Sequence, residues 1–112
     1  MEKGRILVVE DDPDISNLLR IYFDSQGYKV LVAPKGKEAL HVCRRELPNV
    51  IVLDIQLPDI DGYEVCQKIR AFSAVPIIML TALAGEADYM LVDALVADPD
   101  LRDSKEIDAY FL

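Results

Sequence analysis

Short apolar runs alternate with amphipathic stretches along almost the whole chain, and this alternation limits the fold more than any other feature. The apolar runs, rich in Val, Ile and Leu, span residues 5–10, 28–33, 50–54, 75–80 and 107–112. Helical spacing of apolar residues marks the stretches after Pro13, at 37–47, around Val65, Cys66 and Ile69, and at 84–97. Strands that are apolar on both faces belong to parallel sheets covered by helices on both sides. We therefore expect an α/β fold with a doubly wound, five-stranded parallel sheet.

The first two amphipathic stretches carry clear helix signals. Asp12 is a favoured N-cap, Pro13 a favoured first helical residue, and Gly27 suits the position just after a helix. Apolar side chains recur between them at helical spacing: Ile15, Leu18, Leu19, Tyr22 and Phe23. In the second stretch, we expect Ala39, Leu40 and Cys43 to face inward.

Composition excludes several classes of protein. The 112 residues suit one domain, and 52% hydrophobic residues are enough for a core. A net charge of −8 disfavours direct binding to nucleic acid. No apolar run has the length of a membrane span, and the N-terminal run is too short for a signal peptide. Cys43 and Cys66 fit neither a disulfide framework nor a zinc site, so we expect a cytoplasmic protein.

Carboxylates gather where the predicted strands end. The first strand is followed by Glu10 and Asp11, the third ends in Asp54, and the fourth ends at Thr81. In the flavodoxin-like strand order 2-1-3-4-5, strands one and three are neighbours, so the acid pair and Asp54 would converge. A cluster of oxygen ligands favours a hard cation such as Mg²⁺, Mn²⁺ or Ca²⁺, and Mg²⁺ indicates phosphate chemistry. A carboxylate beside such an ion can act as a nucleophile.

Three segments resemble the receiver domains of two-component response regulators, the CheY-like superfamily. They are residues 6–13 (ILVVEDDP), 51–62 (IVLDIQLPDIDG) and 76–82 (PIIMLTA), in the order and at the separations typical of that family. The resemblance extends over about residues 4–97. All three segments in register are a far more specific signal than any one of them.

The resemblance implies a role for particular residues. Asp54 matches the phosphoacceptor aspartate, and Glu10 and Asp11 match the acidic pair that holds Mg²⁺. The backbone carbonyl of Gln56 matches the third protein oxygen on the metal. Thr81 matches the hydroxyl that hydrogen-bonds the attached phosphoryl group.

The implied function is signalling rather than ordinary enzymatic turnover. A sensor histidine kinase or a phosphotransfer protein would donate a phosphoryl group to Asp54, and the domain would promote its own phosphorylation and dephosphorylation. The acyl phosphate would then switch a partner surface through Thr81 and an aromatic residue, here matched to Tyr110. A DNA-binding effector domain is common in the family, which makes transcription regulation the expected output.

The C-terminal part departs from the family pattern. The resemblance places an essential lysine three residues after Tyr110, which would be residue 113, and a final helix after it. The separation between Thr81 and Tyr110 is also longer than expected, and the excess falls in the atypical segment 96–107. Either residues 1–112 are a C-terminally incomplete receiver domain, or a divergent receiver has an altered fourth helix. A missing helix would expose apolar surface, so a homodimer is also expected.

Simpler interpretations apply to several other residues. Asp12 is interpreted as a helix cap, Asp59 and Asp61 as turn formers and a cap for the helix at Gly62, and His41 as a surface residue. The sequence lacks a P-loop, and Gln56 stands where a haloacid-dehalogenase phosphatase needs a second acid. The open alternative is a pseudo-receiver, a protein-interaction module that signals without phosphorylation. The absent lysine favours it, and the intact acids disfavour it.

Overall fold

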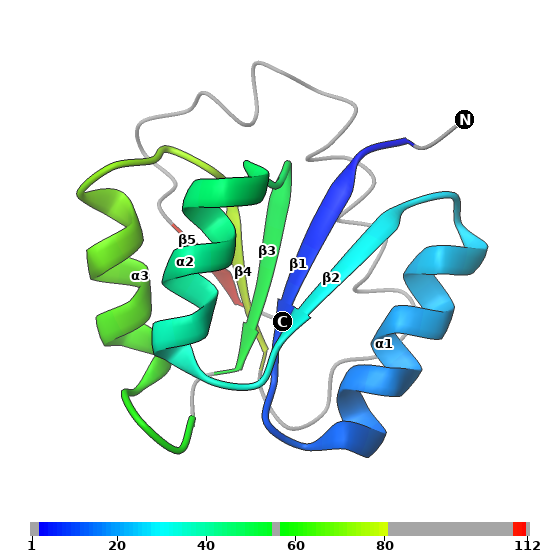
Figure 1. The fold of residues 1–112 in the computed structure, drawn as a ribbon, viewed down its shortest axis with the longest axis horizontal. Coiled ribbons are helices and arrows are strands. Elements are labelled where there is room, and N and C mark those ends of the chain that lie inside the picture. The colour runs from blue at the N-terminus through cyan, green and yellow to red at the C-terminus, as the bar shows by residue number, and fades with distance from the viewer. Residues whose placement is uncertain (1–2, 55–56, 81–108, 112) are drawn as a thin grey trace.

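A five-stranded parallel sheet forms the centre of the computed structural model, which describes residues 3–54, 57–80 and 109–111 (Figure 1). The strand order is β2-β1-β3-β4-β5, as expected from the sequence. The strands are β1 (Arg5–Val9), β2 (Lys29–Ala33), β3 (Val50–Asp54), β4 (Ile77–Leu80) and β5 (Ala109–Phe111), and the helices are α1 (Pro13–Ser25), α2 (Gly36–Glu46) and α3 (Gly62–Arg70). The expected helix at 84–97 and the atypical segment 96–107 lie outside the described residues.

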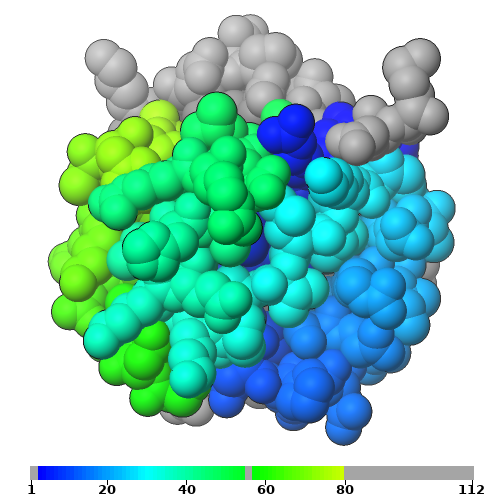
Figure 2. Space-filling model, in the orientation of Figure 1, coloured from blue at the N-terminus to red at the C-terminus, as the bar shows by residue number. Residues whose placement is uncertain are grey.

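Two apolar clusters lie on opposite faces of the sheet, because successive strand residues point to opposite sides. In β1, Leu7 and Val9 join the cluster under α2 and α3, whereas Ile6 and Val8 join the cluster under α1. Helices α2 and α3 lie on the face of the sheet that is turned toward the viewer in Figure 1, and the space-filling view of Figure 2 shows their atoms covering that face. In the central strands β1, β3 and β4, residues on both faces are therefore buried, which explains their nearly uninterrupted apolar sequence.

Helix α1 begins and ends as its sequence predicts. The Asp12 side chain accepts a hydrogen bond from the backbone N–H of Asp14 at 2.9 Å, and Pro13 is the first helical residue. Gly27 follows the helix with φ +96°, a conformation that favours glycine. The inward face is narrower than the apolar spacing suggests. Leu19 and Phe23 are buried, but Ile15 and Leu18 are 43% and 68% exposed.

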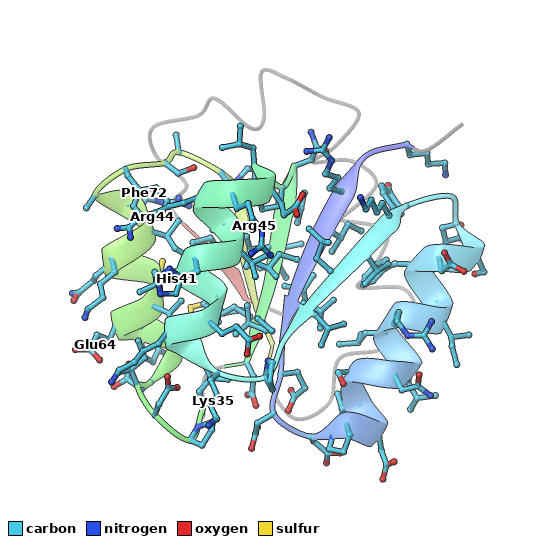
Figure 3. All side chains as sticks on the ribbon, in the orientation of Figure 1. Lys35, His41, Arg44, Arg45, Glu64 and Phe72 are labelled. Atoms are coloured by element: carbon cyan, nitrogen blue, oxygen red, sulfur yellow. The ribbon has the colours of Figure 1, made fainter. Side chains whose placement is uncertain are left out.

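The expected inward residues of α2 are confirmed: Ala39 and Cys43 are buried, and Leu40 packs against the same cluster. Strand β4 begins two residues later than predicted, at Ile77. Pro76 precedes it and offers its carbonyl oxygen to the backbone N–H of Ile51, although a proline has no N–H to donate in return. His41 is exposed on α2, as interpreted from the sequence (Figure 3).

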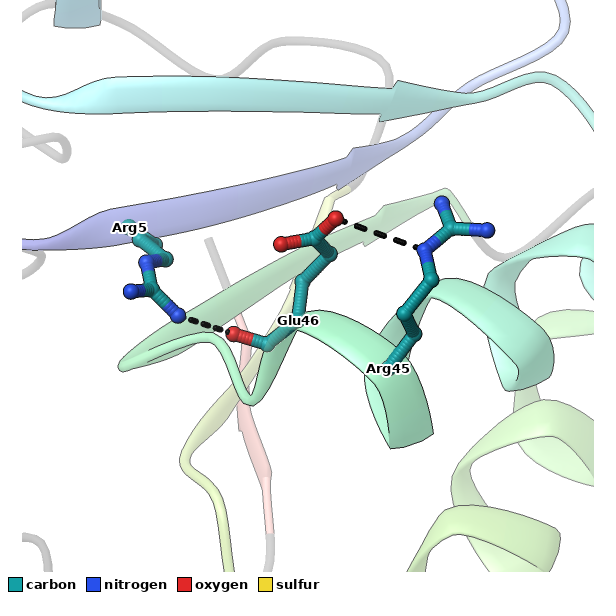
Figure 4. Close-up of polar contacts among 3 residues, drawn as sticks. All are labelled: Arg5, Arg45 and Glu46. Atoms are coloured by element: carbon teal, nitrogen blue, oxygen red, sulfur yellow. Dashed lines mark hydrogen bonds and ion pairs between the residues drawn. The ribbon is translucent and has the colours of Figure 1, made fainter.

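Contacts from a distant strand hold the C-terminal end of α2. The Arg5 guanidinium donates a hydrogen bond to the backbone carbonyl of Glu46 at 2.6 Å (Figure 4). The Glu46 carboxylate lies 3.3 Å from the guanidinium of Arg45. A cation at the last carbonyls of a helix is favourable because it complements the negative end of the helix dipole. Arg5 therefore connects the start of β1 to the end of α2.

Candidate functional site

Three of the predicted site residues meet at the carboxyl edge of the sheet. Strand β1 pairs with β3 so that Val9 is opposite Leu53, which places Glu10 and Asp11 beside Asp54. Carboxylate oxygens of Glu10, Asp11 and Asp54 all lie within 4.8 Å of one another. We call these three residues the acidic cluster. They converge because β1 and β3 are neighbours and both run toward this edge, where open α/β sheets bind ligands.

Glu10 is the most buried member of the acidic cluster, with only 5% of its surface exposed. Its backbone N–H donates to the carbonyl of Ala33 on β2, which fixes the residue at the end of β1. Its carboxylate accepts a hydrogen bond from the backbone N–H of Asp12 at 3.0 Å. Asp54 is half-buried and Asp11 is exposed, so the cluster extends from the sheet edge to solvent.

Burial is the main reason that the pKa of Glu10 rises from 4.5 to about 7. The hydrogen bond from Asp12 opposes this rise, whereas the negative charges of Asp54 and Asp11 and a side-chain hydrogen bond with Asp54 add to it. Near neutral pH, the proton on Glu10 thus relieves the repulsion within the cluster. A bound cation would do the same and would leave all three carboxylates free to act as ligands.

The donor set of the acidic cluster fits a magnesium ion. All three groups are carboxylates, and Mg²⁺ prefers oxygen ligands, with one or two carboxylates beside water and phosphate oxygens. The crowding of negative charge around a half-buried Asp54 also needs compensation by a positive charge. The residues present therefore suit a hard divalent cation at this edge.

The other predicted site residues are not placed here. Gln56 and Thr81 lie outside the described residues. Tyr110 belongs to β5, where its backbone is paired with Ile78 of β4. Asp12 caps α1 and Asp61 caps α3, accepting from the N–H of Glu64 at 2.8 Å, as interpreted from the sequence.

Asp59 has a contact that the sequence interpretation missed. Its carboxylate accepts hydrogen bonds from the backbone N–H groups of Gly36 and Lys37, both at 2.9 Å. The residue is thus a cap for α2 and not only a turn former. One signal pointed toward it: neither Lys35 nor Gly36, which precede the helix predicted at 37–47, carries a side-chain oxygen, so the first amides of that helix lacked a local acceptor.

The sequence model of the response regulator receiver domain matches residues 6–108. The chain belongs to this family. Receiver domains are the signalling phosphoacceptors of two-component systems, and they interact with histidine kinases or phosphotransfer proteins.

Curated relatives of this receiver domain are transcriptional regulators. The chain is 46% identical over 98 residues to the probable transcriptional regulator ycf27 of Porphyridium aerugineum, covering 88% of the chain and 41% of that protein. It is 44% identical over 88 residues to the transcriptional regulatory protein YxdJ of Bacillus subtilis, covering 79% of the chain and 38% of that protein. The chain therefore spans about two fifths of the length of these relatives.

Solved receiver structures match in fold and sequence. The BeF3-activated receiver domain of RstA from Klebsiella pneumoniae has a TM-score of 0.71 and 31% identity, covering 96% of this chain and 84% of that one. The response regulator TrrA from Thermotoga maritima, in complex with Mg²⁺-BeF, has a TM-score of 0.71 and 34% identity, covering 100% and 86%. None of these matches supports the pseudo-receiver alternative.

Within the described part of the receiver domain, no helix is both long and apolar enough to cross a membrane.

Proposed function

We propose that this receiver domain accepts a phosphoryl group on Asp54 and that Mg²⁺ is required for the transfer. The convergence of Glu10, Asp11 and Asp54 within 4.8 Å at the end of β3 carries the proposal. Glu10, Asp11, Asp54 and the backbone carbonyl of Gln56 would hold the ion. When bound, Mg²⁺ would neutralise negative charge on the transferred group and on the carboxylates around it.

In this reaction a carboxylate oxygen of Asp54 attacks the phosphorus atom in line. The bond between phosphorus and a histidine nitrogen of the donor breaks, and the nitrogen keeps the electron pair. The product is an acyl phosphate on Asp54. The donor we propose is a sensor histidine kinase or a phosphotransfer protein in the cytoplasm. Hydrolysis of the acyl phosphate, promoted by the domain itself, would reset Asp54.

Signalling would follow from the charge and hydrogen-bonding capacity of the new phosphoryl group. Thr81 would donate a hydrogen bond to it, and Tyr110 would change its packing in response, which would alter a surface for a partner or for a second copy of the domain. Regulation of transcription is proposed as the output because the curated relatives are transcriptional regulators. The acidic receiver itself would not contact DNA.

Uptake of a phosphoryl group from acetyl phosphate tests this function. We expect the intact mass of the chain to rise by one phosphoryl group in the presence of Mg²⁺, and to stay unchanged with EDTA. Asp54→Asn should abolish the adduct, because an amide oxygen is a far weaker nucleophile than a carboxylate. Asp24→Asn, which removes an exposed carboxylate in α1, is the matched control and should retain it. Equal adduct on the Asp54 variant and the unaltered chain would refute the proposal.

A further inference from the structure

Helix α2 begins without a cap of its own. Lys35 occupies the N-cap position with extended backbone angles, φ −135° and ψ 153°, and its side chain makes no capping hydrogen bond. The first amides of a helix have no partner within the helix, and a cation near them opposes the helix dipole. Figure 3 shows Lys35 at the end of α2 that faces the loop between β3 and α3.

Asp59 supplies the missing cap from that loop. One carboxylate oxygen accepts from the N–H of Gly36 and the other from the N–H of Lys37, each at 2.9 Å. These bonds, the one from Lys37 first among them, lower the pKa of Asp59 from 3.8 to about 2. The carboxylate therefore stays charged at neutral pH and remains a strong acceptor for both amides. We call the contacts of Asp59 with Gly36 and Lys37 the α2 clamp.

Close packing reinforces the α2 clamp. Gly36 is buried, and a Cβ atom on it would lie 2.5 Å from Cγ1 of Ile60 and 2.7 Å from Cγ2 of Val65. Ile60 and Leu57 are partly buried against the cluster under α2 and α3. The loop thus lies directly against the start of α2, and only a residue without a side chain fits there.

The α2 clamp lies within the short connection that follows the phosphoacceptor. Asp54 is the last residue of β3, Asp59 comes five residues later, and Asp61 already caps α3. Because β3 and α3 hold the two ends of the connection, the clamp anchors its middle to another element through polar contacts. Removal of the Asp59 carboxylate would release residues 57–60 of the connection from the start of α2.

We propose that Asp59 is a positioning residue of the phosphoacceptor site, which by clamping the start of α2 keeps the connection after Asp54 in the arrangement that binds Mg²⁺. This inference rests on the proposed function of Asp54. Asp59 is not a member of the acidic cluster, and the contacts through which it would act are those with Gly36 and Lys37. Groups that hydrogen-bond a metal ligand directly change metal affinity by about ten- to a hundredfold when they are mutated. Asp59 would act at one remove from the ligands, so we expect an effect at the lower end of that range.

A role in helix capping alone can be separated from this positioning role. Lys35→Ser would give α2 a cap of its own, and the introduced hydroxyl would form a capping box with Glu38, in which each side chain bonds the backbone N–H of the other residue. In an Asp59→Ala background this change should restore the stability of α2. It should not restore the connection between α2 and the loop, because position 35 does not belong to that loop.

Mg²⁺ titration by calorimetry, paired with thermal unfolding, tests the inference on four chains: unaltered, Asp59→Ala, Asp59→Ala with Lys35→Ser, and Glu38→Gln. We expect Asp59→Ala to bind Mg²⁺ about tenfold more weakly and to melt at a lower temperature. The double variant should regain its melting temperature but not its affinity. Glu38→Gln removes an exposed carboxylate from the same helical turn and should bind within about twofold of the unaltered chain.

Two results would overturn the inference. One is unchanged Mg²⁺ affinity in Asp59→Ala, and the other is recovery of affinity together with stability in the double variant, which would make Asp59 a helix cap only. Failure of the unaltered chain to bind Mg²⁺ would instead contradict the proposed function. The double variant also keeps the test valid if Asp59→Ala alone does not fold.

Discussion

At the scale of single residues, Glu10 is the member of the site in which burial most strongly opposes ionisation. The residue is buried, and the negative charges of Asp54 and Asp11 lie close to its carboxylate. Without a cation, its ionised form is unfavourable, which is why its pKa rises to about 7. A core position of this kind would normally be apolar, so the acid costs stability in return for a ligand at the sheet edge.

Glu10→Gln should therefore stabilise the metal-free chain. Because the pKa of Glu10 is higher in the folded chain than the ordinary 4.5, the folded state holds the proton more tightly. The unaltered chain then loses stability as pH rises from about 4.5 to about 7, and the variant does not. We expect Glu10→Gln to be more stable above pH 7 by about 2 to 3 kcal/mol, measured by urea unfolding in EDTA.

The gain from Glu10→Gln should disappear below about pH 4.5, where both chains are neutral at this position. Asp24→Asn serves as the control and should show no such gain, since it removes an exposed acid of α1 that lies outside the acidic cluster. A Glu10→Gln chain that is less stable than the unaltered one at pH 8 would show that ionisation of the buried Glu10 carboxylate does not destabilise the folded chain.

At the scale of helices and strands, local signals predicted most of the fold, and contacts between distant segments escaped prediction. Asp12 and Asp61 were identifiable as caps because they bond amides two and three residues away. Asp59 was not, because its partners Gly36 and Lys37 lie more than twenty residues earlier in the chain. Spacing alone also could not tell that Leu18 is exposed while Leu19 is buried. Periodicity gives the direction of a side chain but not what covers it.

Gly36→Ala should destabilise the chain, although alanine is the better helix former. The new methyl group would lie 2.5 Å from Ile60 and 2.7 Å from Val65, so the loop would have to move away from α2. Overpacking of this kind typically costs about 1 to 3 kcal/mol, which urea unfolding would measure. In an Ile60→Ala background the cost should fall, because the nearest clash is removed. Equal costs in the two backgrounds would contradict the close packing of loop and helix.

At the scale of the whole molecule, the order of the strands creates the site. Because β1 and β3 are adjacent at the centre of the sheet, residues 43 positions or more apart in sequence form one cluster. This convergence of Glu10, Asp11 and Asp54 was predicted from the alternation of strands and helices. Burial as the chief cause of the raised pKa of Glu10 was not, since it depends on how tightly the sheet edge packs. The roles of Gln56, Thr81 and Tyr110 stay predictions.

The most direct test of phosphorylation at Asp54 is to locate the phosphoryl group on the chain. After reaction with acetyl phosphate and Mg²⁺, borohydride reduction converts an aspartyl phosphate to homoserine, and peptide mass spectrometry then identifies the altered residue. We expect homoserine at residue 54 and at no other aspartate position. Homoserine at the positions of Asp11, Asp12 or Asp59, with residue 54 unchanged, would contradict it.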